Sequence, residues 1–110
     1  MTVSGKITLE PQLDENSSAQ RDPLYHVIIL NDEDHTIDYV VEMLQAVLGM
    51  PAAQAMSCTL EADRTGSSIV STCALEEAET KRDRIHAYGP DWRLPQSRGS
   101  VAALVEPAAS

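Results

Sequence analysis

Hydrophobic and polar residues alternate along the chain with two different repeat lengths, and each change of repeat marks a new element. Residues 24–30 (LYHVIIL) form a short run rich in β-branched side chains, which is typical of a buried strand. Residues 67–75 (SSIVSTCAL) and 100–107 (SVAALVEP) have the same character. The pattern therefore predicts three strands.

Helical spacing begins at Ile37, directly after an acidic stretch. The apolar residues that share one stripe of this helix are Ile37, Val40, Val41, Leu44, Val47 and Leu48. The opposite side is polar, and Gly49 is a natural helix stop. An amphipathic helix is predicted over residues 37–48.

Two more helices are predicted further along the chain. Residues 50–66 carry Pro51 in the first helical turn and Gly66 in the turn that follows the helix. Residues 76–90 form a third helix with a highly charged surface, closed by Gly-Pro. The residues expected on the buried side of the second helix are Ala52, Ala55, Met56 and Leu60.

The predicted order is strand, helix, helix, strand, helix, strand. This order indicates an α+β protein, an α/β sandwich in which a three-stranded antiparallel sheet packs against three helices. Residues 1–22 are polar and show no sustained period, so we expect a flexible N-terminal extension. The folded domain is expected over residues 23–107, followed by a short tail at 108–110.

The composition narrows the classes of partner. The chain of 110 residues has a formal net charge of -9, which repels nucleic-acid phosphates and anionic membranes. A cationic partner is favoured instead. No run resembles a signal peptide or reaches membrane-spanning length, so a soluble cytoplasmic protein is expected. Cys58 and Cys73 lie outside any CxxC motif and are interpreted as small buried hydrophobes of a reducing compartment.

The acidic stretch NDEDH at residues 31–35 suggests metal binding or catalysis as possible roles. Consecutive acids point in different directions, however, and no second His/Cys cluster or calcium-loop spacing accompanies them. GxSxG, HExxH and phosphate-binding glycine loops are absent from the sequence. We therefore expect no catalytic residue, metal ion or cofactor, and a small metal-dependent hydrolase built on the acidic turn is the remote alternative.

Helix capping explains part of the acidic stretch. Thr36 or Asp34 could serve as the N-cap, and Asp38 could be the acidic half of a capping box that begins at His35. Capping accounts for one or two of the acids. It leaves Asn31 and Asp32 unexplained, because both come where the first strand ends.

Two longer segments resemble a known family. Residues 25–49 (YHVIILNDEDHTIDYVVEMLQAVLG) are similar to the signature of the ClpS family, the small adaptors of the ATP-dependent Clp protease. EEAETKRDRIHAYG resembles the Ala-Glu-Thr-Lys helix of that family, and TG before the second strand matches its glycine turn. The similarity runs without gaps from Tyr25 to Tyr88 and resumes at the last strand after a slightly longer loop. The α/β sandwich implied by the resemblance agrees with the element order.

The resemblance implies a binding function without catalysis. ClpS adaptors bind the free N-terminus of proteins whose first residue is bulky and hydrophobic, a signal called an N-degron. They deliver these proteins to a Clp unfoldase by docking on its N-terminal domain. We therefore expect a monomeric adaptor whose partners are N-degron substrates and a ClpA- or ClpC-type ATPase.

The matched positions imply three sets of site residues. The residues expected to bind the α-ammonium of the cargo are Asn31, Asp32 and Asp63. The residues expected to line the hydrophobic pocket are His35, Ile37, Val40, Met56 and Thr59. Glu76 and Lys81 fall on the positions that contact the unfoldase.

Four positions depart from the family pattern. Asp63 replaces a histidine, Thr59 replaces a methionine of the pocket wall, and His35-Thr36 stands where the family has Thr-Pro. The pocket is therefore expected to be smaller and more polar, with a large ring at its mouth. An alternative within the same fold is a regulator or adaptor of Clp with altered cargo specificity.

Overall fold

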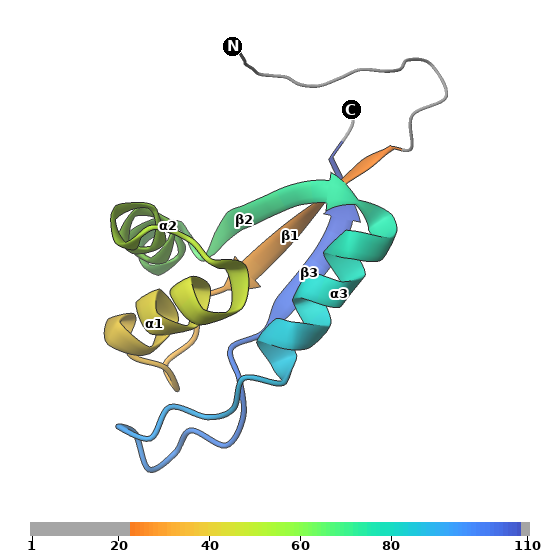
Figure 1. Cartoon of the computed structure of the whole chain (residues 1–110). Coiled ribbons are helices and arrows are strands. Elements are labelled where there is room, and N and C mark those ends of the chain that lie inside the picture. Colours follow the sequence, from red (N-terminus) through yellow and green to blue (C-terminus); the bar gives the residue numbers. More distant parts are fainter. Residues whose placement is uncertain (1–22, 109–110) are drawn as a thin grey trace.

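A computed structural model describes residues 23–108 of the chain (Figure 1). The elements are β1 (Leu24–Leu30), α1 (Ile37–Leu48), α2 (Ala52–Thr65), β2 (Ser67–Ala74), α3 (Leu75–His86) and β3 (Ala103–Pro107). This order and the α+β class confirm the prediction from sequence. The extension expected at residues 1–22 lies outside the described residues, as do residues 109–110 of the expected tail. None of the helices described is long and apolar enough to cross a membrane.

The sheet has β1 at its centre, paired antiparallel with β2 on one side and β3 on the other (Figure 1). Side chains alternate across a pleated strand, so Val27 and Ile29 share one face of β1 and Ile28 takes the other. Ile28 pairs with Ile69 of β2 and with Leu104 of β3. Val27 and Ile29 belong to the buried core cluster, which places the helices on their side of the sheet.

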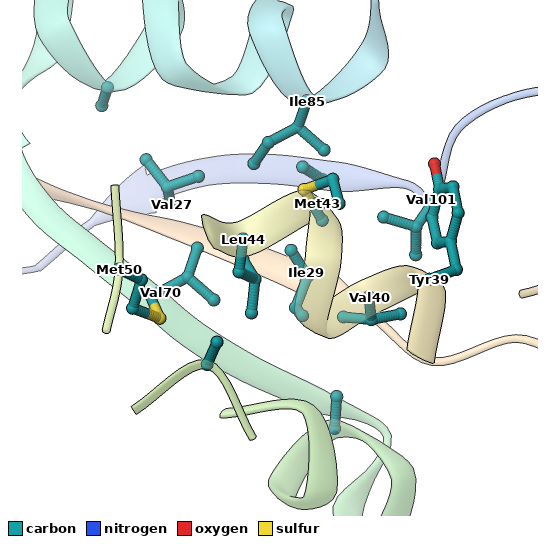
Figure 2. Close-up of a cluster of buried hydrophobic side chains, with 14 residues drawn as sticks. Val27, Ile29, Tyr39, Val40, Met43, Leu44, Met50, Val70, Ile85 and Val101 are labelled. Atoms are coloured by element: carbon teal, nitrogen blue, oxygen red, sulfur yellow. The ribbon is translucent and has the colours of Figure 1, made fainter. Parts of the chain in front are cut away.

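The core forms where α1 and α3 meet the sheet. Figure 2 shows Met43 and Leu44 of α1 and Ile85 of α3 converging on Val27 and Ile29 of β1. All five side chains are almost completely buried. Burial of each such side chain stabilises the fold by about 1.5–3 kcal/mol. These contacts fix α1 on the sheet, and α1 carries one wall of the site described below.

Helix α2 presents a different side to the core from the one predicted. Met56 is 39% exposed and Leu60 is 40% exposed, and Ala52 is exposed as well. The residues of α2 that are buried are Ala55, Thr59 and Ala62. Helix α2 packs against both α1 and β2, and small side chains allow this close approach. The assignment of Ala52, Met56 and Leu60 to the buried side is therefore wrong, whereas that of Ala55 is confirmed.

The ends of the elements follow local signals, with shifts of a few residues from the prediction. Gly49 and Gly66 end α1 and α2 in the left-handed region, with φ values of 67° and 99°. Pro51 is the N-cap of α2 rather than a residue of its first turn. Helix α3 ends at His86, so residues 87–102 form a longer irregular loop than expected. The two cysteines are free thiols and half-buried.

Candidate functional site

A small cavity of about 50 Å³ lies at the end of β1, between the start of α1 and the second half of α2. The residues that line it are Ile29, Leu30, Asn31, Asp32, His35, Thr36, Ile37, Val40, Thr59, Ala62, Asp63 and Val101. Its apolar part comes from core residues that include Ile29, Val40 and Ala62. Its polar part comes from the turn after β1, from the start of α1 and from α2, where Thr59 is buried and Asp63 is exposed. The pocket therefore has a mixed apolar and polar interior and an acidic mouth.

Backbone hydrogen bonds hold the turn that forms the mouth. The Asn31 N–H donates to the carbonyl of Gly66 at 2.9 Å, and the Leu30 N–H donates to the carbonyl of Ala102 at 3.0 Å. These bonds attach the end of β1 to the residues that directly precede β2 and β3. The Asp32 carboxylate then accepts the Asp34 N–H at 2.9 Å, which tightens the turn. The orientation of Asp32 is therefore set by local structure.

Thr36 is the N-cap of α1. Its hydroxyl oxygen accepts the Tyr39 N–H at 3.1 Å, so the alternative cap Asp34 is excluded. Tyr39, not Asp38, occupies the position that a capping box would fill, and the predicted box is therefore wrong. Asp38 remains in the first helical turn, where its negative charge interacts favourably with the positive end of the helix dipole.

His35 links the turn to the loop after α3. Its Nδ1 lies 2.8 and 2.9 Å from the two carboxylate oxygens of Asp32, and its Nε2 lies 2.7 Å from the carbonyl oxygen of Gly99. The ring packs on Tyr39 with 4.6 Å between centroids. The side chain is only 6% exposed, so the ring forms part of the pocket wall.

Asp91 is a buried carboxylate beneath the start of α1 that the sequence analysis missed. One oxygen accepts the N–H and the hydroxyl of Thr36 at 2.7 and 2.8 Å, and the other accepts the N–H and guanidinium of Arg93 at 3.0 and 3.2 Å. Burial favours the neutral acid, but these hydrogen bonds outweigh it and lower the pKa of Asp91 to about 2. Arg93 also pairs with Glu42 of α1 at 2.7 Å. No local pattern marks Asp91, because its main partner is 55 positions away in the chain.

Most of the site residues expected from sequence meet at this one pocket. Those among its lining residues are Asn31, Asp32, His35, Ile37, Val40, Thr59 and Asp63. Met56 is absent from the lining, because it lies on the exposed side of α2. Ala62 takes a place in that wall instead. Its position one helical turn after Thr59 could have identified it.

Glu76 and Lys81 lie on α3, away from the pocket. Glu76 is exposed and borders a second cavity of about 360 Å³ beside Tyr25 at the start of β1. The Lys81 ammonium donates to the Ser71 hydroxyl at 2.8 Å and pairs with Glu77 at 3.2 Å. The two expected contact residues are therefore on one helix but have different surroundings.

The acidic mouth has no arrangement suited to a metal ion. Over residues 23–108, His, Cys, Asp and Glu side chains nowhere gather in a group of three or more that could hold one. Asp32 is instead directed at His35, and Asp34 and Glu33 are exposed. The chemistry that this mouth offers is the acceptance of hydrogen bonds from a cation, next to a partly apolar cavity.

Comparison with known proteins gives a consistent result. Residues 20–93 match the family model described as the ATP-dependent Clp protease adaptor protein ClpS. The ATP-dependent Clp protease adapter protein ClpS of Alkalilimnicola ehrlichii is 35% identical over 97 residues, which cover 87% of this chain and 88% of that protein. The protein of the same name from Nautilia profundicola is 38% identical over 63 residues, 57% of this chain and 65% of that protein.

A solved structure supports the same relationship. ClpS2 of Agrobacterium tumefaciens, bound to L-phenylalaninamide, superposes with a TM-score of 0.68 at 30% sequence identity. The superposition covers 79% of this chain and 99% of that one. The family model spans about two thirds of the 110 residues and includes every residue that lines the pocket except Val101. On these grounds the chain belongs to the ClpS family.

Proposed function

We propose that this chain is an adaptor of the ATP-dependent Clp protease that binds the free N-terminus of proteins with a bulky hydrophobic first residue. The observation that carries the proposal is the pocket itself, a partly apolar cavity whose mouth holds Asn31, Asp32 and Asp63. L-phenylalaninamide, the ligand of the Agrobacterium relative, combines a free amino group with a large apolar side chain. A peptide N-terminus presents the same two features.

The ammonium of the cargo is held by the acidic mouth. An α-ammonium carries three donor hydrogens, which need acceptors when the group leaves water. The side-chain oxygen of Asn31 and the carboxylates of Asp32 and Asp63 supply them, with Asp63 taking the place of the family's histidine. Each charge-assisted hydrogen bond contributes roughly 1.5–3 kcal/mol. Burial of a leucine-sized side chain adds about 1.5–3 kcal/mol. After the free-energy cost of association is subtracted, these contributions correspond to a dissociation constant of roughly micromolar size.

The adaptor carries out no covalent chemistry and acts by bringing cargo to its partner. Glu76 and Lys81 on α3 are proposed to contact the N-terminal domain of a ClpA- or ClpC-type unfoldase. Glu76 is exposed, Lys81 is half-buried and neither lines the pocket, so cargo and unfoldase can bind together. The adaptor acts as a monomer in the cytoplasm.

The size of the pocket favours a narrower choice of cargo than the family as a whole. A cavity of roughly 150 Å³ accommodates a benzene-sized ring, whereas this one measures about 50 Å³. Thr59 and His35 also make the wall more polar than an apolar first residue requires. The second candidate function is therefore a Clp adaptor with altered cargo, in which leucine is preferred over aromatic first residues.

Fluorescence anisotropy with short labelled peptides tests both candidates. Peptides that begin with Leu, Phe, Tyr or Trp are compared with free and with acetylated N-termini. We expect binding of the free forms, strongest for Leu, and a loss of more than tenfold on acetylation. Equal affinity for free and acetylated peptides would rule out an ammonium site. Equal affinity for all four first residues would rule out the narrower cargo choice.

Variants separate recognition from folding. Asp63→Asn removes a charge at an exposed position, so the thermal midpoint should stay unchanged while affinity falls roughly tenfold, as expected for about 1.4 kcal/mol. Asp34→Asn is the matched control, because Asp34 is also exposed but lies outside the pocket lining. Equal effects of the two substitutions on affinity would show that overall charge, rather than the pocket, attracts the peptide.

A further inference from the structure

The two ring nitrogens of His35 both face oxygen atoms that only accept hydrogen bonds. Nδ1 is 2.8 Å from the carboxylate of Asp32, and Nε2 is 2.7 Å from the backbone carbonyl of Gly99. A neutral imidazole carries a single N–H, so it can satisfy one of these acceptors and must direct a lone pair at the other. The arrangement is fully satisfied only when both nitrogens carry hydrogen. The geometry therefore indicates an imidazolium.

The charged groups at the pocket and beneath it are mostly carboxylates. Asp32 comes from the turn, Asp63 lines the pocket from α2, and the ionised Asp91 lies beneath Thr36 from the loop after α3. Tyr39 of α1 contributes a neutral phenol, whose hydroxyl donates to Gly89 at 2.6 Å. Arg93, the cation of that loop, is paired with Asp91 and Glu42. Among the described residues that line the pocket there is no lysine or arginine.

We infer that, in the protein without cargo, the His35 imidazolium is the counter-ion of the Asp32 carboxylate, and that the ammonium of a cargo N-terminus replaces it there. This inference rests on the proposed function. When the cargo ammonium pairs with the Asp32 carboxylate, the N–H at Nδ1 of His35 loses its hydrogen-bond acceptor and has a positive charge next to it. That proton passes to the solvent, and the Nε2–H remains on the carbonyl of Gly99. Cargo binding thereby releases a proton without detaching the loop from the pocket.

This exchange makes binding sensitive to pH in a defined direction. Protons and cargo compete for the same site, so acid conditions weaken binding and affinity rises as the imidazolium of His35 gives way to the neutral ring. Peptide α-amino groups ordinarily titrate at about 7.7–8.0, so affinity falls again above that range. Binding is therefore expected to pass through a maximum below the pH at which the peptide amino group loses its charge.

Titration calorimetry at pH 6.0 tests the inference. A peptide with a free N-terminal leucine is titrated into the protein in two buffers of different ionisation enthalpy, because the difference in apparent heat counts the protons released. The α-ammonium of the peptide is already fully charged at this pH. We expect a large fraction of one proton per peptide for the parent protein and almost none for His35→Gln. His26→Gln is the matched control, since His26 bonds to Thr72 on the sheet and should behave like the parent.

The outcomes separate the inference from the adaptor function. Peptide binding with the same proton release in His35→Gln as in the parent would overturn the role of His35 and leave the adaptor function standing. If no peptide binds in either buffer, the adaptor function fails and this inference fails with it. Should His35→Gln not fold, ¹⁵N spectra of the parent decide, since both ring nitrogens should be protonated before peptide is added and one afterwards. A neutral ring beside a protonated Asp32 in the free protein would overturn the inference.

Discussion

The buried carboxylate of Asp91 should be the most sensitive polar position in the domain, and Asp91→Asn is the variant that tests this. The substitution keeps the shape of the side chain and removes its charge. Its amide group replaces one acceptor oxygen, so either the two donors of Thr36 or the two donors of Arg93 lose their partner. Helix α1 would then begin over an unsatisfied buried group.

The size of the effect follows from the hydrogen bonds of Asp91 and agrees with their influence on its pKa. Hydrogen bonds to a charged acceptor contribute roughly 1.5–3 kcal/mol each, and loss of two that share a network predicts about 2–4 kcal/mol. The pKa of Asp91 is about 2 in the folded protein against an ordinary value of 3.8. That difference corresponds to roughly 2.5 kcal/mol at neutral pH. For a domain of this size, about 2 kcal/mol lowers the melting temperature by roughly 8–16 °C.

The sign of the pH dependence gives a second check. Because folding lowers the pKa of Asp91, its contribution is present in full above about pH 4 and is lost as the pH falls towards 2. The stability difference between the parent and Asp91→Asn, measured by urea unfolding, should therefore be largest at neutral pH and shrink below pH 4. Asp83→Asn is the control, since Asp83 is exposed on α3. A loss below 0.5 kcal/mol, or one that is constant from pH 3 to 7, would refute the reasoning.

Two further predictions concern packing. Met43→Ala should lower the free energy of unfolding in urea by about 2–5 kcal/mol, because Met43 is fully buried. Met56→Ala should lower it by less than about 1 kcal/mol, because Met56 is 39% exposed. Equal losses for the two variants would contradict the orientation of α2. Tyr39→Phe should cost about 1 kcal/mol, since the hydroxyl bond to Gly89 is lost. Burial raises the pKa of Tyr39, so this difference should be constant at neutral pH and shrink above pH 10; a difference that grows there would contradict the burial of the hydroxyl.

The sequence carried enough information to predict the elements and most of the pocket. Strong periodicity and glycine stops defined α1, and the position of Asn31 and Asp32 directly after a buried strand placed them at the end of the sheet. The phase of α2 could not be predicted in this way. Alanine, methionine, cysteine and leucine occur on all sides of that helix, so hydrophobicity alone favoured Met56 and Leu60. Close packing on α1 and β2 instead selects small residues, which is a tertiary effect.

The loop after α3 explains the rest of what the sequence did not reveal. Asp91 and the carbonyl of Gly99 become part of the site only because residues 87–102 fold back under the start of α1. Both contacts join residues more than 50 positions apart, and one of them uses a backbone atom that no side-chain pattern can mark. Contacts of this kind depend on the path of an irregular loop, which has no periodicity to read.

The substitutions at the pocket mouth offset one another in charge. The resemblance places Asp63 at a histidine position of the family and His35 at a threonine position, and on that expectation the site keeps one imidazole and gains one carboxylate. A second carboxylate beside Asp32 would be destabilising without a cation, and the imidazolium of His35 supplies that cation. The two positions should therefore be energetically coupled. Asp63→His should therefore weaken peptide binding less in a His35→Thr background than in the parent, because the imidazolium that competes with the cargo ammonium is then absent.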